Sequence, residues 1–247
     1  MSHNPLGPAD PALEQLLRRP DIWRGHAHRF SGDRSPAVST GYAELDGALL
    51  HRGWPCGALV EICQATYQAE FALLSPGILA SAGYVVLLNP PSQPFVHALI
   101  QRGIDLDRLV IVESSTRSEF LGCYTELARA ASCSAVVGWQ PREALTYTDV
   151  RRCALALDGS KGLYWLMRPN TVQQQSSPAG LRLFCKLTPD GLEVTVFKQK
   201  GWLKQSGRPI VLPLPAEWRE FAPPGAIDVE QPSAAEGQAK GPVQRRP

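Results

Sequence analysis

Several features that mark common protein classes are missing from this sequence of 247 residues. No apolar run approaches the roughly 20 residues that a membrane-spanning helix needs. The amino terminus, MSHNPLGPAD, lacks the charged-then-apolar layout of a secretion signal. A net charge of +2 is too small to indicate a nucleic-acid partner by itself, so any basic surface has to be local. We therefore expect a protein of the cytosol that does not associate with membranes.

Cysteine pairs are also missing. The six cysteines occur singly with no CxxC spacing, mostly within apolar stretches such as ALVEIC and RLFCKL, and the five histidines do not lie at ligand spacings from them. This pattern favours small buried core residues in a reducing compartment over disulfides or zinc ligands. We therefore predict no metal site.

Short motifs of common catalytic sites are absent as well. The sequence has no GxSxG, no HExxH and no Cys/His pairing with local motif support, and we predict no catalytic residue. Asp105 and Asp107 are paired carboxylates, but we expect them in a structural turn that Asp105 caps. Asp46 is expected to brace the entry to the core rather than act as an acid. Because triads are assembled from distant residues, an unfamiliar enzyme stays an open alternative.

What is present is an alternation of apolar runs and helical patterns from Val38 onward. Buried runs separated by helices predict an α/β fold with a mostly parallel sheet flanked by helices. LRLFCKL and GLEVTVFK follow one another across TPDG and predict an antiparallel hairpin at one edge of the sheet. The expected strands are 58–63, 84–89, 108–113, 134–139 and 162–167, and the expected helices are 93–102, 117–131 and 146–157.

Three regions follow from composition. Residues 1–37 are expected to form an amino-terminal helix, PALEQLLRRP, and a polar linker, and residues 38–220 the core. Residues 221–247 are rich in Pro, Gly, Ala and Gln and predict a disordered tail. Within the core, Pro76 interrupts the helical pattern FALLSPGILA, so the helix either kinks there or restarts with Ser75 as its cap.

The order of segments resembles the core of the RecA recombinase family over roughly residues 38–212. The segments that carry the resemblance are VSTGYAELDGAL, GWPCGALVEI, a loop with the helix after it, YVVLLN and RGIDLDRLVIVES. The last of these is similar to the Gly-Val-Asp-hydrophobic-Asp-Asn-Leu segment of that family. The resemblance implies a RecA-like core in which the loop after VEI occupies the position of the Walker A motif.

A working Walker A motif needs glycines whose amides face phosphate, a lysine that supplies positive charge, and a hydroxyl that holds magnesium. At these positions the chain has Gln64 and Ala69 for the glycines, Glu70 for the lysine and Phe71 for the hydroxyl. Two unit charges about 4 Å apart interact by roughly 4 kcal/mol at an effective dielectric constant of 20, so the change from lysine to glutamate opposes ATP binding. We predict a loop without a nucleotide cofactor.

Two further parts of the ATPase machinery have no counterpart. The catalytic glutamate expected after the second strand falls near Pro90 or Pro91, and the Walker B aspartate falls on Gly138 or Trp139. None of these residues supplies a carboxylate. The alternative, that this strand, loop and helix are unrelated to RecA, leaves the absence of GxxxxGK unchanged.

A RecA-like chain without its nucleotide site resembles the ImuA-like proteins of translesion DNA synthesis, which are related to the SulA-type division inhibitors. The features that carry this resemblance are PALEQLLRRPDIWRG, GWPCGALVEI, VVLLNPPSQPF and LEVTVFKQKG. The resemblance implies a non-catalytic accessory protein of an SOS-induced mutagenic DNA damage response. Its implied partners are an ImuB-like inactive Y-family polymerase relative and an error-prone replicative-type polymerase. A SulA-like inhibitor of a tubulin-like GTPase and a RecA-like ATPase with a non-standard phosphate site are the alternatives.

Single-stranded DNA and RecA are further candidate partners. Two segments are candidates for contact with single-stranded DNA. KQKGWLKQSGR combines four cations with a tryptophan and has no acidic residue, which suits phosphate contact and base stacking. Its candidate residues are Lys198, Lys200, Trp202, Lys204 and Arg208. Residues 167–180 offer only Arg168 as a cation. The alternative for the first segment is a solvated loop with a buried tryptophan. The alternative for residues 167–180 is an ordinary flexible loop.

Overall fold

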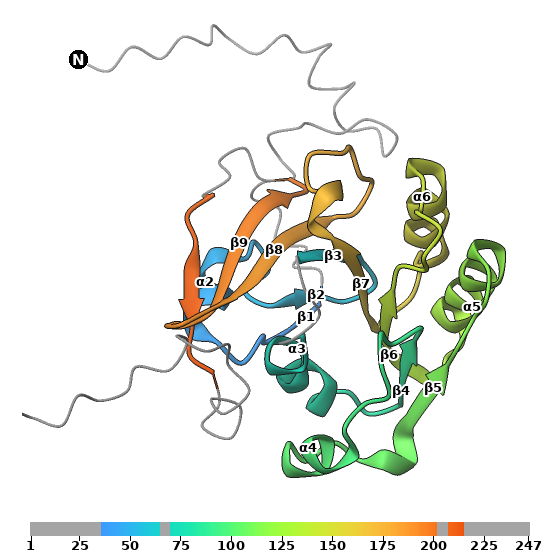
Figure 1. The fold of residues 1–247 in the computed structure, drawn as a ribbon, viewed down its shortest axis with the longest axis horizontal. Coiled ribbons are helices and arrows are strands. Elements are labelled where there is room, and N and C mark those ends of the chain that lie inside the picture. The colour runs from blue at the N-terminus through green and yellow to red at the C-terminus, as the bar shows by residue number, and fades with distance from the viewer. Residues whose placement is uncertain (1–35, 65–69, 202–206, 215–247) are drawn as a thin grey trace, which may run out of the picture.

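The computed structural model describes residues 36–64, 70–201 and 207–214 (Figure 1). The predicted amino-terminal helix and the predicted tail lie outside these residues, as do Ala69, Trp202 and Lys204. Of the helices in the described part of the chain, none has both the length and the apolar character that crossing a bilayer requires.

An eight-stranded sheet organises the chain, with the strand order β10-β9-β8-β3-β7-β6-β4-β5. The neighbours from β8 to β5 are all paired in parallel, whereas β9 is antiparallel to both β8 and β10. The predicted α/β class, the mostly parallel sheet and the antiparallel edge are therefore confirmed. The strands are β3 Leu59–Gln64, β4 Tyr84–Leu88, β5 Leu109–Val112, β6 Cys133–Trp139, β7 Leu163–Pro169, β8 Leu181–Thr188, β9 Gly191–Gln199 and β10 Ile210–Leu212.

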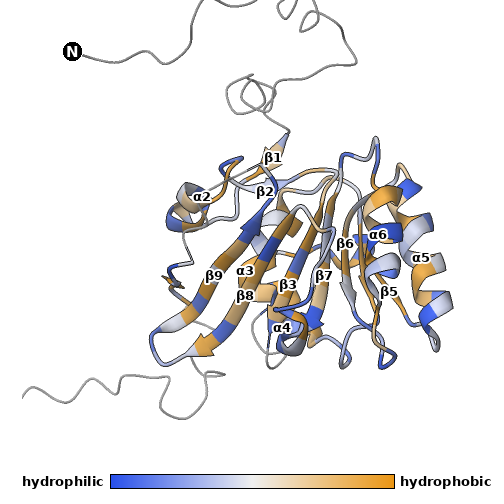
Figure 2. Cartoon of the chain, turned by 90° about the horizontal axis from the view of Figure 1, so that it is seen from above, coloured by the Kyte–Doolittle hydropathy of each residue, from blue (hydrophilic) through white to orange (hydrophobic). Residues whose placement is uncertain are grey.

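Helices cover both faces of this sheet, so alternate side chains of each central strand enter two separate cores. One core contains Val60 and Ile62 of β3 and lies under α2 Ala43–Ala48, α3 Glu70–Leu79 and α4 Val96–Gln101. The other contains Leu59 and lies under α5 Arg117–Arg129 and α6 Tyr147–Ala156. Burial on both faces explains the continuous apolar runs of the sequence. Figure 2 shows these strands largely in orange, with blue segments along β8 and β3.

Smaller elements complete the fold. A two-stranded antiparallel sheet pairs β1 Ala37–Val38 with β2 Trp54–Pro55. The 3-10 helices are η2 Leu106–Arg108 and η3 Asn170–Val172. Thr116 and Thr146 begin α5 and α6 with complete capping boxes, because each hydroxyl accepts from the third helical N–H and that residue's carboxylate accepts from the cap N–H. These caps set helix starts that the sequence predicted to within one residue.

Pro76 lies inside the single helix α3, which settles the alternative that the sequence left open. Proline has no N–H, so the carbonyl oxygen of Ala72 loses its helical donor. The hydroxyl of Tyr42 donates to that oxygen at 2.9 Å and replaces the missing bond. Burial raises the pKa of Tyr42, which keeps the hydroxyl protonated as a donor.

The carboxylates expected to be structural have that role. Asp105 accepts from the backbone N–H of Asp107 at 3.0 Å and caps η2. Asp46 accepts from the Thr40 N–H at 2.8 Å and the Ser39 hydroxyl at 2.6 Å, which ties the chain entering the core to α2.

Gly57, in the turn before β3, approaches the backbone of Ser160 closely, and substitution there tests how much this close contact matters for stability. Its φ is +64°, and a Cβ atom there would overlap the carbonyl oxygen of Ser160. Gly159 has a φ of +76° with open space around it and is a matched control. We expect Gly57→Ala to lower the free energy of unfolding by about 3 kcal/mol and Gly159→Ala by only about 1 kcal/mol, measured by chemical denaturation. Equal losses in the two variants would show that the close approach of Gly57 to Ser160 contributes nothing to the free energy of unfolding.

Candidate functional site

The sequence predicts a degenerate phosphate loop between β3 and α3, and residues 65–69 of that loop lie outside the described part of the chain. Strand β3 lies between β7 and β8 near the middle of the sheet, and its carboxyl end leads into this loop. In open α/β sheets, ligands bind at the carboxyl ends of the strands. The carboxyl end of β3 therefore lies in the region where such a fold would bind a nucleotide.

Glu70, at the position of the Walker lysine, is bonded within the protein. The residue is 8% exposed, and its Oε1 accepts from Gln64 Nε2 at 2.9 Å and from Trp139 Nε1 at 3.3 Å. Gln64 stands at a Walker A glycine position and Trp139 at the Walker B position. Residues at three positions of the expected nucleotide machinery therefore contact one another, and all three were singled out from the sequence.

Two neighbouring positions of the expected machinery, Phe71 and Gly138, lie in closely packed surroundings. The ring of Phe71, at the hydroxyl position, lies 6.3 Å from the ring of Trp139 at a tilt of 41°. A Cβ atom on Gly138 would lie only 3.2 Å from the ring of Tyr124, so the buried β6 leaves no room for a carboxylate there. The part of the chain that the structure describes thus offers no magnesium ligand at the predicted Walker B position.

A cavity of about 240 Å³ opens beside these residues, between the start of α3 and the β4–α4 connection. Among its described lining residues there is no Lys, Arg or His. The lining residues are Glu70, Phe71, Pro90, Pro91, Ser92, Gln93, Pro94, Phe95, Ala98, Leu99 and Trp139. Pro90 and Pro91, at the expected position of the catalytic glutamate, contribute apolar surface to it. With one carboxylate and a largely apolar lining, the cavity disfavours phosphate.

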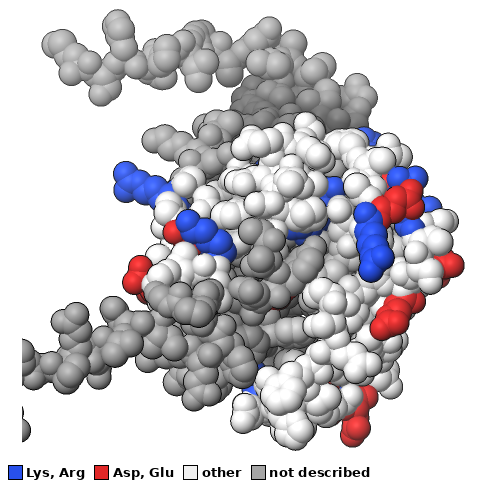
Figure 3. Space-filling model, in the orientation of Figure 1, with Lys and Arg blue, Asp and Glu red and all other residues white. Residues whose placement is uncertain are grey.

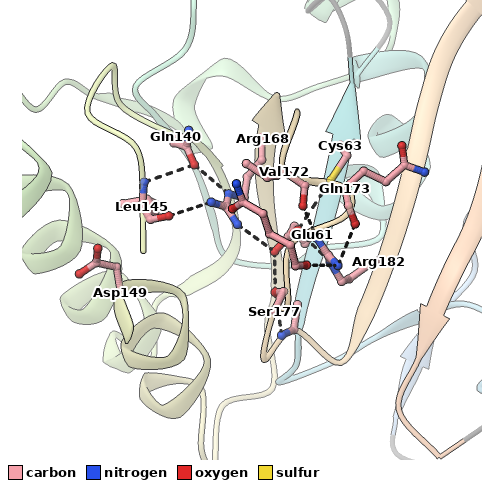
Figure 4. A network of polar contacts seen from close by, with 12 residues as sticks. Glu61, Cys63, Gln140, Leu145, Asp149, Arg168, Val172, Gln173, Ser177 and Arg182 are labelled. Atoms are coloured by element: carbon pink, nitrogen blue, oxygen red, sulfur yellow. Dashed lines mark hydrogen bonds and ion pairs between the residues drawn. The ribbon is translucent and has the colours of Figure 1, made fainter. Parts of the chain in front are cut away.

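A second cluster of polar residues lies on the opposite face of the sheet, around Glu61 in the middle of β3 (Figure 4). Glu61 is fully buried, and its Oε1 accepts from Arg182 Nε at 2.8 Å and Nη2 at 2.6 Å. Its Oε2 accepts from the Ser177 hydroxyl at 2.6 Å and from Arg168 Nη1 at 3.4 Å. The cluster joins β3, β7 and β8, and it was missed by the sequence reasoning because strand adjacency is required to see it.

The remaining donors of both guanidinium groups bond to backbone and amide oxygens. Arg182 donates to the carbonyl oxygens of Val172 at 3.0 Å and Gln175 at 2.9 Å, and Arg168 donates to the carbonyl oxygen of Leu145 at 2.9 Å and to Gln140 Oε1 at 2.8 Å. The Arg182 bonds hold the connection from η3 to β8 against the sheet, and the Arg168 bonds hold the connection from β6 to α6. Arg168, a candidate for DNA contact, is 2% exposed, so its charge is not presented at the surface.

The basic segment after β9 is only partly described. Lys198 is half-buried, and its Nζ donates to the carbonyl oxygen of Ser177. Burial, reinforced by Arg182, lowers the pKa of Lys198. Lys200 and Arg208 are exposed, whereas Trp202 and Lys204 lie outside the described residues. Figure 3 shows charges of both signs scattered over the described part of one face, without a continuous basic surface there.

The cysteines are unpaired, with four buried and two of intermediate exposure. Burial raises the pKa of the thiols of Cys63 and Cys153 to about 12, which keeps them protonated at neutral pH. Within residues 36–64, 70–201 and 207–214, no group of three or more His, Cys, Asp or Glu side chains is placed to hold a metal ion.

A scan against protein-family models finds no match to this chain, and a search of curated proteins finds no similar sequence.

The Glu61 cluster can be tested through stability. Glu61→Gln removes one charge from a buried group while both guanidinium groups remain, and breaking a buried pair in this way costs about 3–5 kcal/mol. Glu193→Gln is the control, because Glu193 pairs with a half-exposed Lys186 at 2.9 Å and should change stability by less than about 1 kcal/mol. Urea denaturation of the two variants measures this difference. A loss for Glu61→Gln no larger than the control's would contradict the role assigned to the cluster.

Proposed function

We propose that this protein is a non-catalytic accessory factor of a bacterial SOS-induced mutagenic translesion DNA synthesis complex. In this proposal it binds an ImuB-like inactive Y-family polymerase relative and, together with it, an error-prone replicative-type polymerase. The ImuA-like and RecA-like segment order suggests the proposal, and the α/β sheet with its antiparallel edge is compatible with it. The observation that carries its non-catalytic part is the bonding of Glu70 to Gln64 and Trp139.

The chemistry of that contact opposes nucleotide binding in two ways. The carboxylate of Glu70 would repel a triphosphate where a P-loop protein presents a lysine, by roughly 4 kcal/mol at 4 Å and an effective dielectric constant of 20. Trp139 and Gly138 also provide no oxygen ligand for the magnesium ion that accompanies ATP. A protein built this way acts through its surfaces rather than through hydrolysis.

Contact with single-stranded DNA is a second part of the proposal. Lys200 and Arg208 are exposed on either side of residues 202–206, and burial together with the charges of Arg182 and Lys200 lowers the pKa of Lys198. Cations on a connection with a tryptophan nearby in sequence suit contact with a phosphate backbone and one stacked base. RecA and the polymerase relatives remain candidate partners alongside the DNA.

We expect calorimetric titration of the purified protein with Mg-ATP to give no binding heat up to millimolar nucleotide. The physical reason is the carboxylate at the lysine position together with the missing magnesium ligand. RecA titrated under the same conditions is the positive control. Micromolar binding would favour the alternative of an ATPase with a non-standard phosphate site.

Neutralising Lys198, Lys200, Lys204 and Arg208 to Gln should weaken single-strand binding. The slope of log affinity against log salt concentration should flatten by about 0.7 for each phosphate group that the variant no longer neutralises. Fluorescence anisotropy of a labelled oligonucleotide at several salt concentrations measures both quantities. The control variant neutralises Arg142, Arg151 and Lys161, which are exposed on another part of the molecule.

If the two variants bind alike, the basic segment has no role in DNA binding. If the wild-type protein does not bind single-stranded DNA at all, the result favours the SulA-like alternative, because an inhibitor of a tubulin-like GTPase does not need to bind DNA.

A further inference from the structure

A second cavity lies at the opposite end of β3 from the cavity beside Glu70. Its volume is about 240 Å³, and it opens between the turn from α2 to β2 and the adjoining ends of β8 and β9. Figure 2 shows α2 beside β9 in this region. Ala58, which precedes β3, and Leu181, which begins β8, both line the cavity. It therefore lies at the amino end of two parallel strands and is separate from the crevice at their carboxyl ends.

Hydrogen bonds within the protein hold the walls of this cavity in place. The Gln199 side chain accepts from the Leu50 N–H at 2.8 Å and donates to the carbonyl oxygen of Ala48 at 2.9 Å, which joins β9 to the end of α2. The Lys200 N–H donates to the carbonyl oxygen of Gly180 at 2.7 Å, which joins the end of β9 to the residue before β8. Because the walls are fixed in this way, a ligand does not lose affinity by having to order them.

The charges at this cavity favour an anion. Lys200 lines the cavity and is exposed, and no Asp or Glu is among the described lining residues. Arg52 is also exposed and lies between two lining residues, His51 and Gly53. Neither Arg52 nor Lys200 forms an ion pair with a carboxylate in the described part of the chain. Burial lowers the pKa of His51, so its ring is neutral at pH 7 and offers a flat aromatic surface.

Arg52 has a backbone conformation that is uncommon for a residue with a side chain. Its φ is +60°, in the left-handed region that glycine adopts without strain. Glycine would therefore form the turn from α2 to β2 at a lower conformational cost. Residues held in such conformations cluster at functional sites. A role for the arginine side chain beside the cavity accounts for its presence in this turn.

The shape and the lining of the cavity fit a single base better than an acidic side chain. Its volume lies below the roughly 300–1,000 Å³ typical of sites for whole small molecules and cofactors. Unstacked bases of single strands pack on aromatic side chains, histidine included, while Arg and Lys bind the phosphate groups. Leu49, Pro55 and Leu181 add apolar surface to the ring of His51. An acidic side chain would use the cations and leave this apolar and aromatic lining without a partner.

We propose that this cavity takes one unstacked base of single-stranded DNA, with Arg52 and Lys200 binding the adjoining phosphate groups. The assignment rests on the proposed contact with single-stranded DNA, and it adds the turn between α2 and β2 to the basic segment as a binding surface. Lys198 and Arg208 contribute further positive charge along the strand. A free nucleotide gains only one stacked base and few phosphate contacts, which falls short of millimolar affinity, so Mg-ATP still gives no binding heat.

Cys56 also lines the cavity and reports on its occupant. Its thiol has intermediate exposure, as does that of Cys123 on α5, whereas the other four cysteines are buried. Alkylation of the full-length wild-type protein with N-ethylmaleimide at about pH 8.5, followed by mass spectrometry, measures both thiols in one sample. An oligonucleotide that occupies about nine-tenths of the protein should slow the alkylation of Cys56 about tenfold and leave that of Cys123 unchanged.

Other ligands in the same assay identify what enters the cavity. A strand of abasic sites, which has phosphate groups but no bases, should leave Cys56 unprotected at saturation, and so should polyglutamate and millimolar deoxyadenosine monophosphate. Protection of Cys56 by any of these three would overturn the assignment. Oligonucleotide binding without protection would also overturn it, while leaving the proposed DNA contact intact. No binding of the oligonucleotide at all would overturn both.

Arg52→Gly separates the role of the side chain from that of the backbone. Glycine adopts a φ of +60° freely, so the variant should be at least as stable as the wild type in urea. It should nevertheless bind the oligonucleotide about fivefold more weakly, with a salt slope flatter by about 0.7. The control is Arg151→Gln, which removes an exposed cation from α6. Unchanged affinity for Arg52→Gly, or an equal loss in the control, would overturn the role assigned to Arg52.

Discussion

A fully buried carboxylate in the central strand is the constraint on which much of this structure depends. Removing the charge of Glu61 from water costs several kcal/mol, and the structure compensates with two guanidinium groups and a hydroxyl. One carboxylate facing Arg168 and Arg182 leaves an excess positive charge inside the protein. The carbonyl oxygens of Leu145, Val172 and Gln175 offset it, because each accepts a hydrogen bond from a guanidinium group.

This arrangement explains a connection that has little regular structure. Residues 172–180, VQQQSSPAG, provide few apolar side chains to pack, yet Val172 and Ala179 are buried. Carbonyl groups of this stretch bond to Arg182, and the Ser177 hydroxyl bonds to Glu61. Residues 167–180, the second candidate segment for contact with single-stranded DNA, are therefore held against the sheet by the Glu61 cluster, and their one arginine, Arg168, bonds to Glu61 and Gln140.

The sequence predicted the sheet class, the hairpin and three helices, because each depends on local periodicity or on turn chemistry. Thr116 and Glu119, for example, carry the start of α5 within four residues. The Glu61 cluster was not predictable in the same way. Glu61 and Arg182 are 121 positions apart and meet only because β8 pairs with β3 rather than with β7, the strand before it in the chain. The hydrogen bond from the Tyr42 hydroxyl to the carbonyl oxygen of Ala72 likewise could not be predicted from the sequence, because it joins residues that only the tertiary structure brings together.

The two clusters of polar residues, around Glu61 and around Glu70, lie on opposite faces of the sheet and differ in how they are built. On the α5 and α6 face, charges are neutralised within the protein, so that region has little capacity left for a ligand. On the α3 face, the carboxylate of Glu70 lies among Trp139, Phe71 and prolines at the edge of an open cavity. A carboxylate at the carboxyl end of the strands, where an open α/β sheet binds its ligand, disfavours a phosphate group there.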